Sequence, residues 1–189
     1  MFIQTEQTPN PATLKFLPGL PVMGTGTADF TNRDEAAGRS PLAARLFAID
    51  GVAAVFFGSD FITITKAADK EWYLLKPAVL GAIMEHMTAG LPVMSDVPAH
   101  DAEAHGAADD GEDSEVIGQI KELLDTRVRP AVAQDGGDII FQGFEEGVVY
   151  LHLRGACAGC PSSTATLKMG IENMLKHYIP EVTEVRAAM

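Results

Sequence analysis

The 189-residue chain has little cysteine: Cys157 and Cys160 are its only two. Two cysteines cannot build the disulfide framework of a small secreted protein, so that class is excluded. Basic side chains are also scarce, with 14 Lys and Arg against 26 Asp and Glu and a net charge of -12. Such an acidic chain is unsuited to general nucleic-acid binding, which needs a basic surface to displace counterions from phosphates.

Long apolar runs are missing as well. Val52–Phe57 is about the longest, far short of the ~20 residues that cross a bilayer. The N-terminus shows no basic-then-apolar signal pattern. We therefore expect a soluble cytoplasmic protein of bacterial type, with no targeting segment and no membrane association. The hydrophobic fraction of 47% is sufficient for packed cores, and the length allows one large domain or two small ones.

The acidic charge is concentrated in one segment. Residues 95–115 carry eight acids and no Lys or Arg, whereas the chain on each side holds nine acids and seven bases. A segment of like charges with no aromatic side chain cannot bury enough apolar surface to offset the conformational entropy that it would lose on ordering. We predict two compact domains, 1–92 and 114–189, joined by a flexible acidic linker at 93–113. Docking of this acidic segment on a basic partner is the alternative.

The first predicted domain is a small α+β unit. Its expected elements are strands at 1–8 and 14–16, a helix at 41–49, strands of a hairpin at 52–57 and 61–66, and a helix containing Leu80, Ile83, Met84 and Met87. We find no cluster of reactive or metal-binding side chains in it. This domain is therefore expected to act through its surface.

The second predicted domain has the order α-β-β-α-β. Its expected elements are a helix from Ser114 that is disturbed at Pro130, strands at 139–144 and 148–153, a helix containing Leu167, Ile171, Met174, Leu175 and Tyr178, and a short strand at 182–185. The two cysteines fall on the loop between the second strand and the second helix. The whole chain is thus predicted to be an α+β protein of two small domains.

The position of Cys157 and Cys160 favours a metal site. Metals bind the thiolate form of cysteine, and the N-terminus of a helix stabilises an anion. Gly155 and Gly159 permit backbone conformations and close approaches that a side chain would hinder. Two intervening residues allow both sulfur atoms to face one metal centre.

The number of ligands predicts a dimer. A structural zinc site or a [4Fe–4S] cluster usually takes four protein ligands, and one chain supplies two cysteines. His152, five residues before Cys157, could approach the pair, but strand alternation equally allows it to be buried or to face solvent. Two chains would supply four thiolates, so the simplest complete site is shared by a homodimer.

Four interpretations of the cysteine pair are open on local chemistry alone. An iron–sulfur cluster is favoured over a shared zinc ion, a thioredoxin-type redox dithiol and a pair of inert buried cysteines. The redox interpretation prefers a motif that opens a helix inside a βαβ unit. Because a hairpin precedes the cysteines, we expect the parallel strand order of such a unit to be absent.

Both halves of the chain resemble one known family. Residues 131–163, which include Asp135-Gly136-Gly137-Asp138 and Gly155-Ala156-Cys157-Ala158-Gly159-Cys160-Pro161-Ser162-Ser163, resemble the C-terminal domain of NifU. Residues 1–19, MFIQTEQTPNPATLKFLPG, resemble the N-terminal domain of Nfu-type proteins. The order of the two domains, with an acidic linker between them, is also similar to that family.

The resemblance implies an iron–sulfur cluster scaffold or carrier rather than an enzyme. Such a protein holds a [4Fe–4S] cluster between two protomers and hands it to apo-proteins. Only Cys157 and Cys160 carry over as ligands, because the chain lacks the cysteine-bearing scaffold and ferredoxin-like regions of full-length NifU. The implied partners are a cysteine desulfurase or upstream scaffold as the source, and lipoyl-protein or aconitase-type enzymes as recipients. The first domain would select recipients or orient the dimer.

Overall fold

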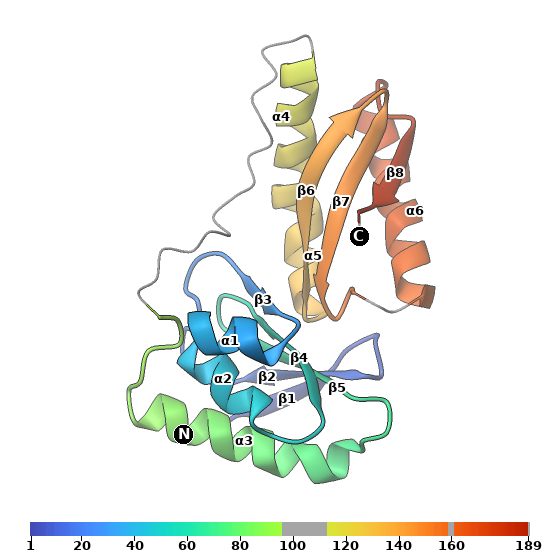
Figure 1. Cartoon of the computed structure of the whole chain (residues 1–189). Coiled ribbons are helices and arrows are strands. Elements are labelled where there is room, and N and C mark those ends of the chain that lie inside the picture. Colours follow the sequence, from blue (N-terminus) through green and yellow to red (C-terminus); the bar gives the residue numbers. More distant parts are fainter. Residues whose placement is uncertain (96–112, 159–160, 189) are drawn as a thin grey trace. The chain divides into compact units, whose positions relative to one another are not determined.

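The structure is a computed structural model that describes residues 1–95, 113–158 and 161–188. The chain divides into two compact units, Met1–His100 and Asp101–Met189, and each combines helices with strands (Figure 1). The predicted α+β class is confirmed. The domain boundaries at 92 and 114 stay predictions, and most of the linker predicted at 93–113 lies outside the described residues.

The first unit is a five-stranded antiparallel sheet with three helices. Its elements are β1 (Gln4–Gln7), β2 (Thr13–Leu17), β3 (Ala28–Phe30), α1 (Arg33–Arg39), α2 (Pro41–Phe47), β4 (Val52–Phe57), β5 (Ile62–Lys66) and α3 (Trp72–Thr88). The strand order is β1-β2-β5-β4-β3. The sequence pattern missed β3 and α1, because elements of three and seven residues are too short to show a clear hydrophobic period.

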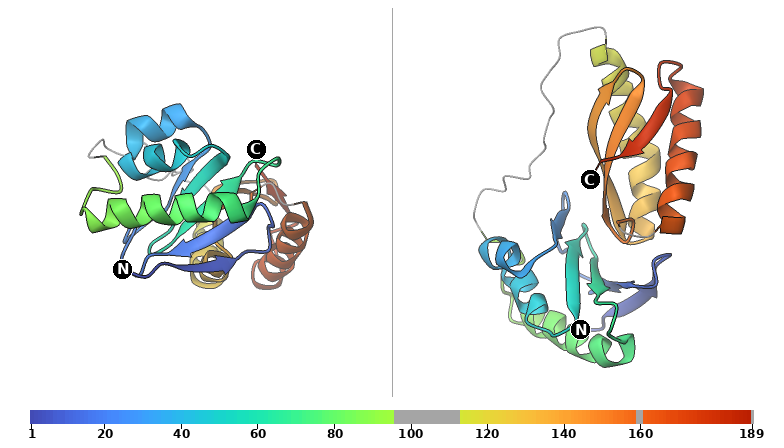
Figure 2. Two further views of the ribbon diagram at one scale, coloured as in Figure 1. Left: turned by 90° about the horizontal axis from the view of Figure 1, so that it is seen from below. Right: turned by 45° about the vertical axis from the view of Figure 1, so that its right-hand side comes forward.

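One face of this sheet forms the core of the first unit. The ribbon views in Figure 2 show α2 and α3 beside the sheet. Alternate residues of the central strands share a buried core with these helices. They are Leu14 and Phe16 of β2, Val55 and Phe57 of β4, and Ile62 and Ile64 of β5, which meet Leu42, Leu46, Val79 and Ile83 of the helices. The stripe predicted for α2 is therefore part of the core. The stripe predicted for α3 is wrong in part, because Met84 is exposed and the helix buries Leu75, Val79, Ile83 and His86.

Ser40 joins α1 to α2 and is fully buried. Its side-chain oxygen accepts a hydrogen bond from the Ala43 N–H at 3.0 Å, which caps α2, and its hydroxyl donates to the Val93 carbonyl. Pro41 occupies the first helical position, where no N–H is needed. One side chain thus starts a helix and holds the segment that follows α3.

Replacing Ser40 by Ala removes both hydrogen bonds and leaves buried groups without partners. We expect the free energy of unfolding of the first unit to fall by about 1–2 kcal/mol. Urea unfolding monitored by the fluorescence of Trp72, the single tryptophan, reports on this unit. Asn32→Ala, which removes only the exposed cap of α1, serves as the control. Equal losses in the two variants would contradict the structural role of the Val93 contact.

The second unit begins with one long helical segment. It runs as α4 (Asp113–Leu123), a π-helical turn η1 (Leu124–Val128) and α5 (Arg129–Gln134). The predicted disturbance at Pro130 is present as this wider turn. Proline lacks an N–H and its ring crowds the carbonyl four residues earlier, so a local change of helical pitch accommodates it. None of the helices in the described ranges is long and apolar enough to cross a membrane.

The remaining elements form a three-stranded sheet with one helix between its last two strands. They are β6 (Gly137–Glu145), β7 (Val148–Gly155), α6 (Pro161–Tyr178) and β8 (Glu184–Ala187). β6 and β7 form the predicted antiparallel hairpin, whereas β7 and β8 pair in parallel. The expected absence of parallel strand order is therefore wrong. β7, α6 and β8 form a βαβ unit, because the final strand returns beside β7 rather than beside β6.

Candidate metal centre

The cysteine loop joins β7 to α6. β7 ends at Gly155 and α6 begins at Pro161, so the loop lies between a strand and the N-terminus of an 18-residue helix, as predicted. Cys157 is within the described residues, whereas Cys160 lies outside them. Cys157 precedes the first residue of α6 by four positions in the sequence, and the N-terminus of a helix stabilises negative charge near it.

Cys157 packs closely against the first residue of β6. A Cβ atom on Gly137 would lie 2.6 Å from the Cys157 sulfur, 2.8 Å from the Arg154 carbonyl oxygen and 3.1 Å from the Cys157 nitrogen. Only glycine leaves room for this approach. Cys157 itself is 8% exposed and belongs to the apolar core of the second unit.

Backbone hydrogen bonds define the path of the loop. The Ala156 N–H donates to the Gly136 carbonyl at 3.1 Å, and the Ala158 N–H donates to the Gly155 carbonyl at 3.1 Å. Gly136 and Gly155 have φ values of 81° and 65°. Residues that carry a Cβ atom rarely adopt this left-handed backbone conformation. The positive φ values of Gly136, before β6, and of Gly155, at the end of β7, therefore allow the backbone path that places Cys157.

An ion pair between the half-buried Arg129 and the buried Asp138 holds the start of β6. Asp138 accepts two hydrogen bonds from Arg129, at 2.9 Å from Nε and 3.0 Å from the second guanidinium nitrogen. These bonds raise the pKa of the Arg129 guanidinium above its ordinary value. Asp138 also accepts from the Ile139 N–H at 2.8 Å. The pair ties α5 to the strand that begins next to Cys157, and the spacing of Arg129 and Asp138 in the sequence did not predict it.

His152 is not brought to the side of Cys157. Leu151 and Leu153 of β7 pack with the core, so the side chain of the residue between them points to the other face of the sheet. In the described part of the chain, no group of three or more His, Cys, Asp or Glu residues is placed to hold a metal ion. Within those residues, Cys157 is therefore not part of a group of three or more such side chains.

The βαβ unit removes one argument against redox chemistry. The cysteine pair precedes a helix that connects two parallel strands, the setting that a thioredoxin-type dithiol prefers. Topology alone therefore does not separate a redox dithiol from a metal site.

The fold and the loop define a class: a two-domain α+β protein whose only cysteines lie between a strand and a helix N-terminus. Residues 3–90 match the family described as Scaffold protein Nfu/NifU N terminal, and residues 120–186 match the NifU-like domain. The human protein "NFU1 iron-sulfur cluster scaffold homolog, mitochondrial" is 54% identical over 190 residues, covering 100% of this chain and 72% of its own length. The chain belongs to the Nfu/NifU family of iron–sulfur cluster scaffold proteins.

A further relative and a solved structure are also similar to this chain. "NifU-like protein 4, mitochondrial" of Arabidopsis thaliana is 54% identical over 187 residues, covering 98% of this chain and 65% of its own length. The solution NMR structure of a NifU-like protein from Saccharomyces cerevisiae is 31% identical, covering 51% of this chain and 86% of its own, with a TM-score of 0.46.

The predicted bacterial-type cytoplasmic location is wrong. The relatives are named as mitochondrial proteins, from human and from plant. The lack of a signal pattern at residue 1 carried no information on this point, because the chain spans only 72% and 65% of the first two relatives' lengths.

Replacing Gly137 by Ala tests the packing at Cys157. The added Cβ must displace a sulfur atom and two backbone atoms, so we expect the second unit to lose about 1–3 kcal/mol of unfolding free energy. Urea unfolding followed by far-ultraviolet circular dichroism measures this loss, while Trp72 fluorescence shows that the first unit is unchanged.

Gly143→Ala is the matched control for this variant. Gly143 lies in the same strand, and a Cβ there would meet nothing within 4 Å. We expect Gly143→Ala to lower the free energy of unfolding of the second unit clearly less than Gly137→Ala does. Equal effects of the two substitutions would mean that Gly137 is not needed for the close approach of Cys157.

Proposed function

We propose that this chain carries a [4Fe–4S] cluster, held by Cys157 and Cys160 of two protomers, and transfers it to apo-proteins. The observation that carries the proposal is the cysteine pair, the chain's only cysteines, on a glycine-lined loop before α6 in a member of a cluster scaffold family. Two thiolates per chain are half of the ligand set of such a cluster. The second half comes from a second copy.

The proposed role is transfer rather than catalysis. A cluster shared between protomers is released when either half-site is weakened, and thiolates of a recipient can replace the ligands one at a time. A cysteine desulfurase or an upstream scaffold would supply the cluster. Lipoyl-protein or aconitase-type enzymes would receive it, with the first domain helping to select them.

Anaerobic reconstitution tests the proposal on the full chain. We expect one cluster for every two chains, with equal amounts of iron and acid-labile sulfide, [4Fe–4S] Mössbauer parameters and a dimer by light scattering. Zinc without labile sulfide would contradict the cluster assignment. Catalytic reduction of a disulfide substrate by the metal-free monomer would favour the redox alternative.

Single substitutions test the ligands. Cys157→Ser and Cys160→Ser should each abolish stable cluster binding and cluster-dependent dimerisation, because each removes two of the four thiolates of the shared site. Circular dichroism should show that the variants are folded. A variant that keeps the cluster would refute the assignment of that cysteine.

A further inference from the structure

The sheet of the second unit has two outer strands, β6 and β8. Its strand order is β6-β7-β8, and within the described part of this unit no strand pairs with the outer side of either one. An outer strand presents backbone N–H and C=O groups to which a strand of another chain can bind. The side chains that meet these groups therefore decide whether the unit joins other chains through its sheet.

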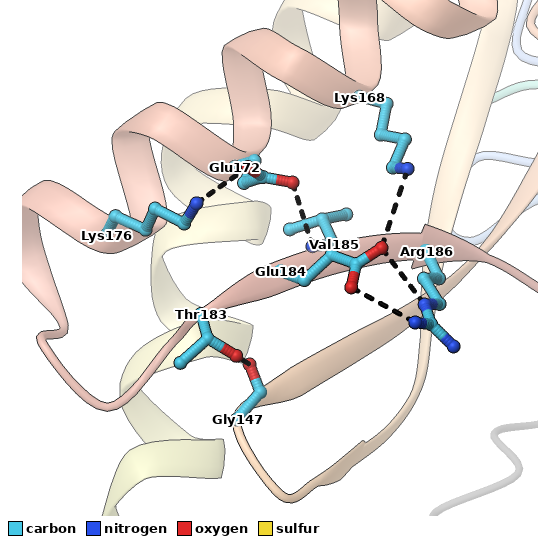
Figure 3. Close-up of polar contacts among 8 residues, drawn as sticks. All are labelled: Gly147, Lys168, Glu172, Lys176, Thr183, Glu184, Val185 and Arg186. Carbon is cyan, nitrogen blue, oxygen red and sulfur yellow. Dashed lines mark hydrogen bonds and ion pairs between the residues drawn. The ribbon is translucent and has the colours of Figure 1, made fainter.

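A carboxylate meets the outer edge of β8. The N–H groups of Glu184 and Ala188 donate to carbonyls of the β6–β7 hairpin. Because the N–H groups of a strand alternate in direction, that of Val185 points away from β7. Glu172 of α6 accepts a hydrogen bond from it at 3.2 Å, and Figure 3 shows this side chain reaching from the helix to the strand.

The Glu172 carboxylate is ionised at neutral pH. Its other oxygen accepts a hydrogen bond from Lys176 Nζ at 2.7 Å, and this bond, together with that from the Val185 N–H, lowers the pKa of the carboxyl. A strand added at this edge would direct a carbonyl oxygen at the Val185 N–H, a position that the carboxylate already occupies. The ion pair of Glu184 and Arg186 on the same strand adds further charge there, and charged side chains on outer strands disfavour pairing with other chains.

A second carboxylate meets the outer edge of β6. The Ala156 N–H donates to the Gly136 carbonyl, and hydrogen-bonded pairs alternate with non-bonded pairs along an antiparallel ladder. The Ile139 N–H therefore points away from β7, and the Asp138 carboxylate accepts from it at 2.8 Å. Arg129 of α5 holds this carboxylate in place. Farther along β6, a shift in its register with β7 also interrupts the edge.

The two edges thus carry the same device, an outward N–H bound by a carboxylate that a helix positions. We propose that Asp138 and Glu172 close this sheet to strand addition and thereby keep metal-free copies of the chain from pairing with one another. The strand that they exclude is the same edge of a second copy, because a twofold axis lets one edge pair with itself.

This inference goes beyond the function proposed above, because it concerns the chain without a cluster. Copies that do not adhere through their sheets can separate when a shared cluster leaves them. The tests below use metal-free protein throughout, so a chain that binds no cluster would refute the proposed function and leave this inference standing.

Three substitutions on α6 separate the contributions of Glu172. Glu172→Ala removes the acceptor at the edge, and alanine is the residue that favours a helix most. Glu172→Gln keeps an oxygen that accepts from the Val185 N–H and gives up the charge. Lys176→Gln removes the ion pair and leaves the contact with the strand.

The first test is sedimentation velocity of the full chain in chelator and reducing agent, over a series of protein concentrations. Glu172→Ala is expected to form a dimer that grows with concentration, whereas the wild type, Glu172→Gln and Lys176→Gln stay monomeric. Association of the wild type or of Glu172→Gln to the same extent as Glu172→Ala overturns the proposal. So does a Glu172→Ala variant that is folded by circular dichroism and monomeric at every concentration.

A proline identifies the surface through which Glu172→Ala associates. Ala187 lies two residues after Val185 on β8, so its N–H also points outward. Ala187→Pro removes this donor on the outer side of an outer strand, where proline is tolerated. The double variant Glu172→Ala/Ala187→Pro is expected to be monomeric. A dimer that persists in it overturns the proposal, because another surface would then be responsible.

Amide hydrogen exchange, measured by NMR on dilute monomeric protein, tests the contact itself. The Val185 N–H is expected to exchange about tenfold faster in Glu172→Ala than in the wild type, since its hydrogen bond to a charged group is lost, and to return towards the wild-type rate in Glu172→Gln. An unchanged rate in Glu172→Ala overturns the proposal.

Ile171→Val is the control for general destabilisation. It trims the core beneath the same helix and leaves the Glu172 contact intact. Its unfolding in urea and its association are compared with those of Glu172→Ala. Ile171→Val is expected to stay monomeric, and association that follows the loss of stability equally in both variants overturns the proposal.

Discussion

The close approach of Cys157 to Gly137 is the constraint on which the second unit depends. It joins the start of β6 to the loop that follows β7, so the hairpin must close with its two ends together. Positive φ values at Gly136 and Gly155 make that closure possible. The ion pair of Arg129 and Asp138 then attaches the preceding helix to the same point. Cys157 is thus held by the sheet, against Gly137, and also by the helix that follows it, because the Thr164 hydroxyl of α6 donates a hydrogen bond to the Cys157 carbonyl at 3.2 Å.

The βαβ unit gives this loop its chemical setting. A helix N-terminus stabilises negative charge, and parallel pairing of β8 with β7 brings α6 back across the sheet. The same arrangement suits a metal thiolate and a redox dithiol, so the architecture does not choose between them. Membership of the Nfu/NifU family, shown over both units, favours the cluster. Glu172, in the second half of α6, accepts a hydrogen bond from the Val185 N–H of β8 and so joins this helix to the outer strand of the sheet.

Much of the fold follows from local patterns in the sequence. The hairpins at β4–β5 and β6–β7 and the helices α2, α3 and α6 were predicted because alternation and helical spacing report secondary structure. The buried face of α3 was predicted only in part, since Met84 is exposed and Leu75 and Val79 are buried instead. Ser40 with Pro41 marked the start of α2, and Pro161 marked that of α6. Ser114, predicted to cap the first helix of the second unit, lies inside α4. β3 and α1 were missed because they are short. The parallel pairing of β8 was missed because a four-residue strand carries no information about which neighbour it will join.

The sequence by itself determined the chemistry available to this protein: two thiols, two residues apart, before a helix and among glycines. Composition and residue type are local properties and can be read directly. Only the tertiary structure decided that Cys157 rests on Gly137, that His152 faces away from it, and that Glu172 meets the Val185 N–H. Those contacts join residues 13 to 20 positions apart, and the energy that forms them comes from packing of the whole sheet.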